Sequence, residues 1–120
     1  MILKDKYGVR YMDSLKRELR ERYLSTYREC KKFGYAPTRF LDMVVSDDDI
    51  VAATRKLIYK EGGTSGFETL YMNKRLDLAV EKIILEPRFR VLFSKEDLDA
   101  AYSRLEEYKY DGLSQIERPE

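Results

Sequence analysis

TSGFETLYMNKRLDLAVEKIILEP, residues 64–87, is the stretch that decides the fold of this chain. Its first part, Ser65–Glu68, has the form of a capping box and predicts the start of a short helix. Asn73-Lys74 is typical of a turn, and Asp77 after it predicts the N-cap of a second helix. This second helix, Leu78–Leu85, is apolar on every side, so we expect it to lie at the centre of a helical core.

Helical patterns continue on both sides of this stretch. Apolar residues at spacings of three and four begin after Asp13 and stop at Gly34, which predicts one long helix. The acidic run Asp47–Asp49 predicts the start of another helix, which Gly62-Gly63 ends, and Ser94 predicts the cap of the last helix. The predicted helices cover approximately residues 13–33, 38–45, 50–61, 65–72, 78–85 and 95–110.

These patterns predict an all-α protein with a single compact domain of five to six helices. The helical domain covers residues 13–110, and residues 111–120 are expected to form a flexible, frayed tail because they lose all periodicity. The order of the short N-terminal segment, residues 1–12, stays open. Its Tyr7, Val9 and Tyr11 alternate as in a strand, but a single strand has no partner with which to pair.

The composition fits a soluble globular domain. The chain has 120 residues, of which 43% are hydrophobic, and its 23 basic and 22 acidic residues give a net charge of +1. No apolar run approaches the roughly 20 residues that a membrane-spanning helix needs. The N-terminus is too polar for a secretory signal, and the one cysteine has no partner for a disulfide, so we expect a cytoplasmic protein without a membrane association.

Residues that commonly carry catalysis are scarce. The chain has no histidine and one cysteine, Cys30, which falls on the apolar face of its helix. Histidine-dependent nucleophiles and zinc fingers are thereby excluded. We therefore expect no catalytic residue, no metal and no cofactor. The one enzymatic alternative is a carboxylate-only site for a divalent metal ion around Asp42, Asp47 and Asp49.

Positive charge gathers in the first third of the chain, where residues 1–40 hold eleven Lys/Arg against five Asp/Glu. On a helix, four of these cations fall within an arc of about 80° and form a basic ridge. The apolar stripe begins in another sector, beside Tyr27. The basic ridge consists of Arg17, Arg20, Arg28 and Lys31. It can contact a protein or a nucleic acid, and the alternative is a plain solvated surface.

A second candidate contact is Arg75, in the turn of the central stretch. Its guanidinium can hold a phosphate or a partner carboxylate through two parallel hydrogen bonds. The structural alternative is that Asp77 caps its helix while Arg75 pairs with Glu81 or another nearby carboxylate. The ten tyrosines are too many for all to be buried in a domain of this size, and tyrosine and arginine are enriched at protein interfaces.

Between Phe33 and Tyr110 the chain carries an ordered series of short motifs. They are Tyr35, Pro37-Thr38, Phe40-Leu41, Gly62-Gly63, Ser65-Gly66-Phe67, Arg75-Leu76-Asp77-Leu78, Val80-Glu81, Leu92-Phe93, Arg104-Leu105 and Tyr108. This series resembles an uncharacterised family of small bacterial and phage all-helical proteins. The resemblance implies a helical domain and no catalytic activity. The family usually has a glycine directly before the arginine of the Arg75-Leu76-Asp77-Leu78 motif, where this chain has Lys74.

Taken together, the residues favour a non-catalytic interaction module that binds a protein through its N-terminal helix and exposed tyrosines. The resemblance implies a bacterial or phage accessory protein. The partner-binding residues predicted from the sequence are Arg17, Arg20, Tyr27, Arg28, Lys31 and Arg75. The alternative is a nucleic-acid-binding domain whose basic ridge contacts phosphates.

Overall fold

The stretch at residues 64–87 forms the middle of the molecule. In the computed structural model, which describes the backbone of residues 2–120 and the side chains of residues 8–120, this stretch contains three short helices. They are α4 (Ser65–Met72), the 3-10 helix η1 (Leu76–Leu78) and α5 (Val80–Ile83). The predicted apolar helix is thus shorter than expected. Pro87 has no N–H to offer to the carbonyl of Ile83, so the chain tightens into turns after α5.

Two predicted helix caps in this stretch are corrected by the structure. The N-cap of α4 is Thr64, whose Oγ1 accepts a hydrogen bond from the Phe67 N–H at 3.0 Å, so the predicted box at Ser65 does not form. Asp77 does not cap α5, because it lies within η1 and the N-cap position of α5 is Ala79; its carboxylate is held by Arg75. A capping box does form at Ser94, which is the cap predicted for the last helix.

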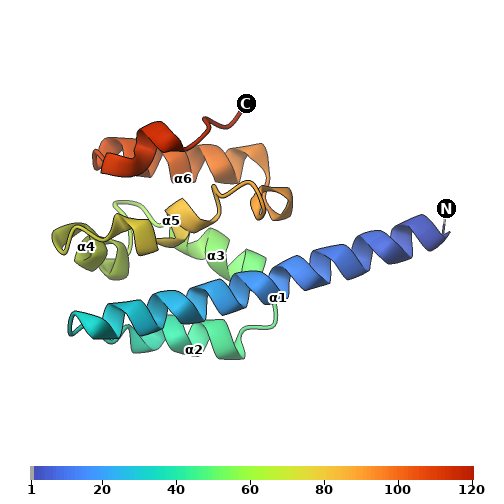
Figure 1. Cartoon of the computed structure of the whole chain (residues 1–120), viewed down its shortest axis with the longest axis horizontal. Coiled ribbons are helices and arrows are strands. Elements are labelled where there is room, and N and C mark those ends of the chain that lie inside the picture. Colours follow the sequence, from blue (N-terminus) through green and yellow to red (C-terminus); the bar gives the residue numbers. More distant parts are fainter. Residues whose placement is uncertain (1) are drawn as a thin grey trace.

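Helix α1 (Ile2–Lys32) starts earlier than the predicted Asp13 and includes the segment whose order was left open. A helix satisfies its own backbone hydrogen bonds, whereas a lone strand at this place would have none. Val9 and Tyr11 are exposed on this part of α1, and the prediction for the Tyr7 side chain lies outside the described residues. Figure 1 shows the first turns of α1 extending beyond the rest of the molecule.

Helices α1 and α4 end in the same way, with one residue in the left-handed region and backbone bonds that close the last turn. At the end of α1 this residue is Gly34, as predicted, with φ of +86°. At the end of α4 it is Lys74, with φ of +59°. Glycine adopts this conformation at a lower energetic cost than lysine.

The helices lie in three layers (Figure 1). Helices α1 and α2 (Thr38–Ser46) pack side by side in one layer, and α3 (Ile50–Ile58), α4 and α5 form the middle layer. Helix α6 (Lys95–Glu107) covers α3 and α5 from the other side. The buried core joins all three layers. Its most completely buried large residues are Leu19, Tyr23, Ile50, Ile58, Ile83, Ile84, Leu85 and Leu105. The all-α single domain predicted from the sequence is confirmed.

Two further 3-10 helices complete the chain: η2 (Arg90–Leu92) before α6 and η3 (Asp111–Gln115) after it. The segment predicted as a tail therefore contains regular structure, and Leu113 and Ile116 pack against the core. Arg90 links this segment to the centre, since it donates hydrogen bonds to the carbonyls of Leu85 and Glu117.

Within the described part of the chain, no helix has both the length and the apolar character needed to cross a membrane.

Candidate functional site

The predicted basic ridge on α1 is divided by the packing of α2. Arg20 donates hydrogen bonds to the carbonyls of Val44 and Asp47 at 2.6 and 2.5 Å, where α2 ends. A helix end has free carbonyls and a partial negative charge, so Arg20 stabilises the end of α2. Its hydrogen-bonding groups are therefore engaged within the protein.

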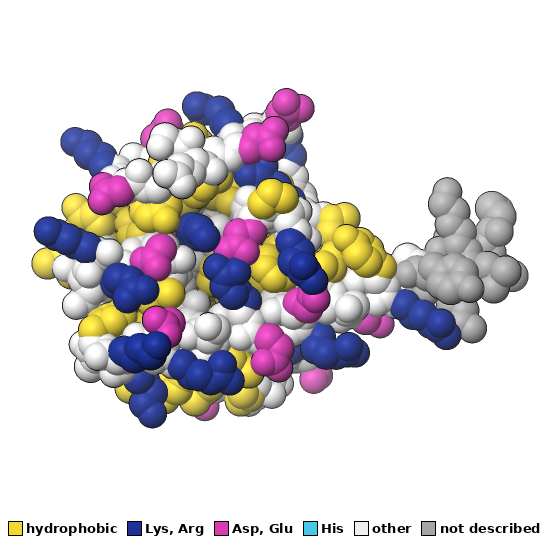
Figure 2. Space-filling model, viewed as in Figure 1, with side chains coloured by type: hydrophobic (Ala, Val, Ile, Leu, Met, Phe, Trp, Pro, Cys, Tyr) yellow, Lys and Arg dark blue, Asp and Glu magenta, His cyan; other side chains and the backbone are white. Residues whose placement is uncertain are grey.

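The other members of the basic ridge remain on the surface. Arg17 and Arg28 are exposed and form no hydrogen bond or ion pair with the described residues. Lys31 is exposed too, and its Nζ lies 5.7 Å from the ring centroid of the half-buried Tyr27. On the face shown in Figure 2, basic side chains alternate with acidic ones rather than forming one continuous patch.

Arg75 uses its guanidinium within the chain. Its Nε and Nη2 donate to the two carboxylate oxygens of Asp77 at 3.0 and 3.1 Å, and its Cζ lies 5.7 Å from the ring centroid of Phe33. The hydrogen bond with Asp77 raises the pKa of Arg75. A phosphate or partner carboxylate would have to displace Asp77 before it could bind in the same manner.

The acidic residues proposed for the enzymatic alternative serve different purposes. Asp49 caps α3, where its carboxylate accepts the Ala52 N–H at 3.0 Å, and this bond lowers the pKa of Asp49. Asp47 accepts the Asp49 N–H at 3.0 Å, and Asp42 is exposed on α2. Among residues 8–120, no three His, Cys, Asp or Glu side chains lie close enough together to hold a metal ion.

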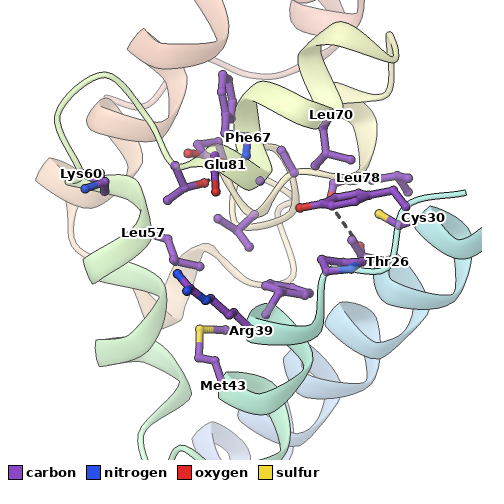
Figure 3. A pocket seen from close by; sticks show the side chains of 18 of the residues that line it. Thr26, Cys30, Arg39, Met43, Leu57, Lys60, Phe67, Leu70, Leu78 and Glu81 are labelled. Atoms are coloured by element: carbon purple, nitrogen blue, oxygen red, sulfur yellow. Dashed lines mark hydrogen bonds between the residues drawn. The ribbon is translucent and has the colours of Figure 1, made fainter.

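The structure reveals a cleft that the sequence did not predict. It lies between the second half of α1, α2, α3 and the start of α4, with η1 and α5 at its base, and has a volume of about 660 Å³ (Figure 3). Such a volume falls in the usual range of ligand-binding pockets, about 300–1,000 Å³. The walls are mostly apolar, and their larger side chains are Phe40, Met43, Leu57, Phe67, Leu70 and Leu78.

An ion pair forms part of the base of the cleft. Glu81 is only 2% exposed, and its carboxylate accepts a hydrogen bond from Arg104 Nη1 at 3.0 Å. Burial raises the pKa of the Glu81 carboxyl, and Arg104 opposes this effect. Arg104 also donates to the carbonyls of Leu57 and Lys60, at 3.3 and 2.5 Å, and so holds the end of α3. The pair therefore joins α3, α5 and α6 beneath the cleft.

The basic rim of the cleft consists of Arg39, Lys56 and Lys60. All three residues are exposed, and within the described part of the chain their side chains form no hydrogen bond or ion pair. Arg39 comes from α2 and extends toward the α3 side (Figure 3), whereas Lys56 and Lys60 lie near the end of α3. The cleft thus has an apolar interior and unpaired positive charges at its mouth.

Three polar residues lie at the α1 side of the cleft, and none of them is activated. Cys30 is buried, and burial raises the pKa of its thiol, so the neutral form is favoured. Burial also raises the pKa of Tyr35. Thr26 Oγ1 donates to the carbonyl of Leu78 at 3.2 Å. These neutral groups suit binding rather than nucleophilic chemistry.

Sequence patterns contained one signal of the basic rim. Lys56 and Lys60 are four residues apart, which places them on the same side of a helix end. Their relation to Arg39 depends on how α2 packs beside α3, and no local pattern determines that arrangement. The exposed tyrosines Tyr59 and Tyr71 lie outside the cleft, on α3 and α4 respectively.

Comparison of the chain with protein-family models, with curated proteins and with solved structures finds no match. The resemblance noted above rests on its sequence motifs alone. The functional argument therefore depends on the geometry of the molecule.

Proposed function

We propose that this protein is a non-catalytic interaction module that binds a segment of another protein in the cleft. The observation that supports the proposal is the combination of a large apolar cleft with an unpaired basic rim. Solvated apolar walls of this kind are uncommon on a surface that has no partner. Burying one large apolar side chain of a partner contributes roughly 1.5–3 kcal/mol, so two or three such side chains would give useful affinity.

A protein partner fits the arrangement of charges better than a nucleic acid does. Of the six residues predicted for binding, Arg20 and Arg75 are engaged in bonds within the chain. A phosphate backbone is bound by several free cations along one face, and binding of this kind does not need an apolar cleft. The nucleic-acid alternative now depends on Arg17, Arg28 and Lys31.

Selection from a displayed library of random peptides tests the proposal directly. Peptides enriched on the purified chain are measured against the wild type and against Met43→Trp, in which a larger side chain fills the cleft. The matched control is Met72→Trp, since Met72 is 71% exposed on α4 and lies outside the cleft. We expect Met43→Trp to weaken binding about tenfold or more, and Met72→Trp to leave it unchanged.

A second variant that fills the cleft keeps the test interpretable if Met43→Trp does not fold. Ala36 is exposed at the edge of the cleft, so Ala36→Trp is expected to keep the fold and also weaken binding. Enriched peptides that bind both blocked variants as tightly as the wild type would contradict the proposal, as would a failure to enrich any peptide.

Duplex DNA binding tests the alternative. If a phosphate backbone were the ligand, affinity would fall steeply between about 50 and 200 mM salt. Arg17→Glu together with Arg28→Glu would then abolish binding, and Met43→Trp would not affect it. We expect no binding of duplex DNA at low salt.

A further inference from the structure

The basic rim has a geometry that restricts the chemistry of the partner. Lys56 lies in the last turn of α3, and Lys60 follows directly after the C-cap Tyr59. The two lysines are thus about one helical turn apart on one lip of the cleft. The backbone of Arg39 is on α2, at the opposite lip, and its side chain extends across toward α3 (Figure 3).

We propose that the cleft selects an acidic amphipathic helix. One face of that helix places apolar side chains between Met43, Leu57 and Phe67. Carboxylates one turn apart on its flank pair with Lys56 and Lys60, and a carboxylate on its other flank pairs with Arg39. This inference rests on the proposed protein-binding function and specifies the partner.

Charge complementarity supports an acidic partner. Two acidic residues also line the cleft. Glu81 is paired with Arg104, whereas Asp47 keeps its charge, since its Oδ1 accepts only the neutral Asp49 N–H. The three cations of the basic rim therefore outnumber the one carboxylate without an ion-pair partner, and the charge at the mouth is positive. Opposite charges at the edge of an interface guide association and select the partner, while the apolar centre provides most of the affinity.

The walls of the cleft favour a helix over an extended peptide. An extended peptide usually binds by adding a strand to a sheet edge, and the described part of this chain has no strand. The walls consist of side chains from helices, which match the binding mode in which an amphipathic helix enters an apolar groove. A helical partner also presents carboxylates at the one-turn spacing of the two lysines.

A designed peptide provides the probe. It is an Ala-rich helix of about 16 residues with capped ends, a length at which such helices begin to be populated. Leucines at positions i, i+3 and i+7 form its apolar face, one flank carries two glutamates spaced i, i+4, and the other flank carries a third glutamate. A second peptide has glutamine in place of each glutamate, and a third has lysine there.

Calorimetric titration of the full chain is expected to show that the Glu peptide binds about tenfold more tightly than the Gln peptide at low salt. The double variant Lys56→Glu/Lys60→Glu should weaken the Glu peptide about tenfold and favour the Lys peptide instead. Arg28→Glu/Lys31→Glu, which reverses two charges of the basic ridge outside the cleft, is the matched control and should leave both affinities unchanged.

Two outcomes separate this inference from the proposed function. If the Glu and Gln peptides bind equally and Met43→Trp abolishes both, the cleft binds protein segments but the preference for acidic helices is wrong. If none of the three peptides binds and the peptide library yields no binder that depends on the cleft, the inference and the proposed function are both wrong. Binding of the Lys peptide to the wild type as tightly as the Glu peptide would also overturn the inference.

Discussion

Two groups of basic residues differ in what they contact. Arg20, Arg90 and Arg104 donate hydrogen bonds to backbone carbonyls, and Arg20 and Arg104 do so at the ends of α2 and α3. The basic rim of the cleft, Arg39, Lys56 and Lys60, contacts no described acceptor. The first group stabilises the fold, and the second is free to bind a partner. Basic residues of this chain therefore occupy two different environments that its sequence does not distinguish.

The largest effect on stability is expected at the base of the cleft. Arg104→Ala leaves the Glu81 carboxylate buried without its partner, which should lower the free energy of unfolding by about 3–5 kcal/mol. Urea denaturation at neutral pH measures this loss. A change below about 1 kcal/mol would show that the ion pair does not hold the layers together.

The same variant should respond to pH in a defined direction. Burial already raises the pKa of Glu81, and removal of Arg104 raises it further. The folded variant then binds a proton at pH values where the unfolded carboxyl has lost it. Its stability should therefore increase as the pH falls from neutral toward the ordinary carboxyl range, and its deficit relative to the wild type should become smaller. A deficit that is constant with pH would contradict a charged, unpaired Glu81.

Asp97 is the next test of the residues that hold the fold. Its buried carboxylate accepts hydrogen bonds from Arg55 Nε at 2.9 Å, from Tyr59 Oη at 2.7 Å and from the Ser94 N–H at 3.0 Å. Burial opposes ionisation, but these hydrogen bonds together lower the pKa of Asp97. Asp97→Asn should cost about 1–2 kcal/mol at neutral pH.

The pH dependence of the free energy of unfolding in the acidic range provides the control for Asp97. Because its pKa is lowered in the fold, the wild-type carboxylate stabilises the protein above the unfolded pKa, and this contribution is lost as the pH falls through the folded value. Asp97→Asn removes that part of the acid dependence. If the free energies of unfolding of the variant and the wild type fell equally with pH in the acidic range, the result would argue against the three hydrogen bonds.

A smaller effect distinguishes two arginines of the predicted basic ridge. Arg20→Ala removes the bonds to Val44 and Asp47 and should destabilise the protein by about 1–2 kcal/mol. Arg17→Ala, on the same helix but exposed, should change stability by less than about 0.5 kcal/mol. Thermal unfolding of both variants gives the comparison. Equal effects would mean that Arg20 has no special role at the end of α2.

A small effect on stability is also expected at the basic rim. Lys56→Glu/Lys60→Glu should shift the free energy of unfolding by less than about 1 kcal/mol, since both side chains are exposed and unpaired. Chemical denaturation checks this value. A large loss of stability would place the two lysines among the residues that hold the fold.

The helices were predictable because their signals are local. Ser94 is a cap as predicted, α3 starts at the predicted acidic run with Asp49 as its cap, Gly34 ends α1, and most of the apolar positions of α1 are buried. The predicted helix caps were wrong at the places where two local signals compete. Thr64 and Ser65 are both good caps, and the bond from Arg75 to Asp77 replaced the predicted cap at Asp77.

The candidate site was less predictable because it depends on tertiary packing. The arc of basic residues on α1 was correct for an isolated helix, but the position of α2 decides which of them remain free. Phe40 and Leu57 have apolar side chains that a sequence pattern assigns to the core, whereas both are half-buried walls of the cleft. A residue of the core and a residue of a binding groove have the same local pattern.

The methionines give the most direct test of the cleft as the binding site. The chain has four methionines. Met43 lines the cleft, whereas Met12 lies on α1 and Met72 on α4, both outside it. Methyl NMR spectra of protein labelled at its methionines, assigned by Met→Leu variants, follow each site during titration with the acidic helical peptide. We predict that the Met43 resonance shifts in proportion to the bound fraction while those of Met12 and Met72 stay in place. Saturable binding that leaves Met43 unchanged and shifts Met12 or Met72 would contradict binding in the cleft.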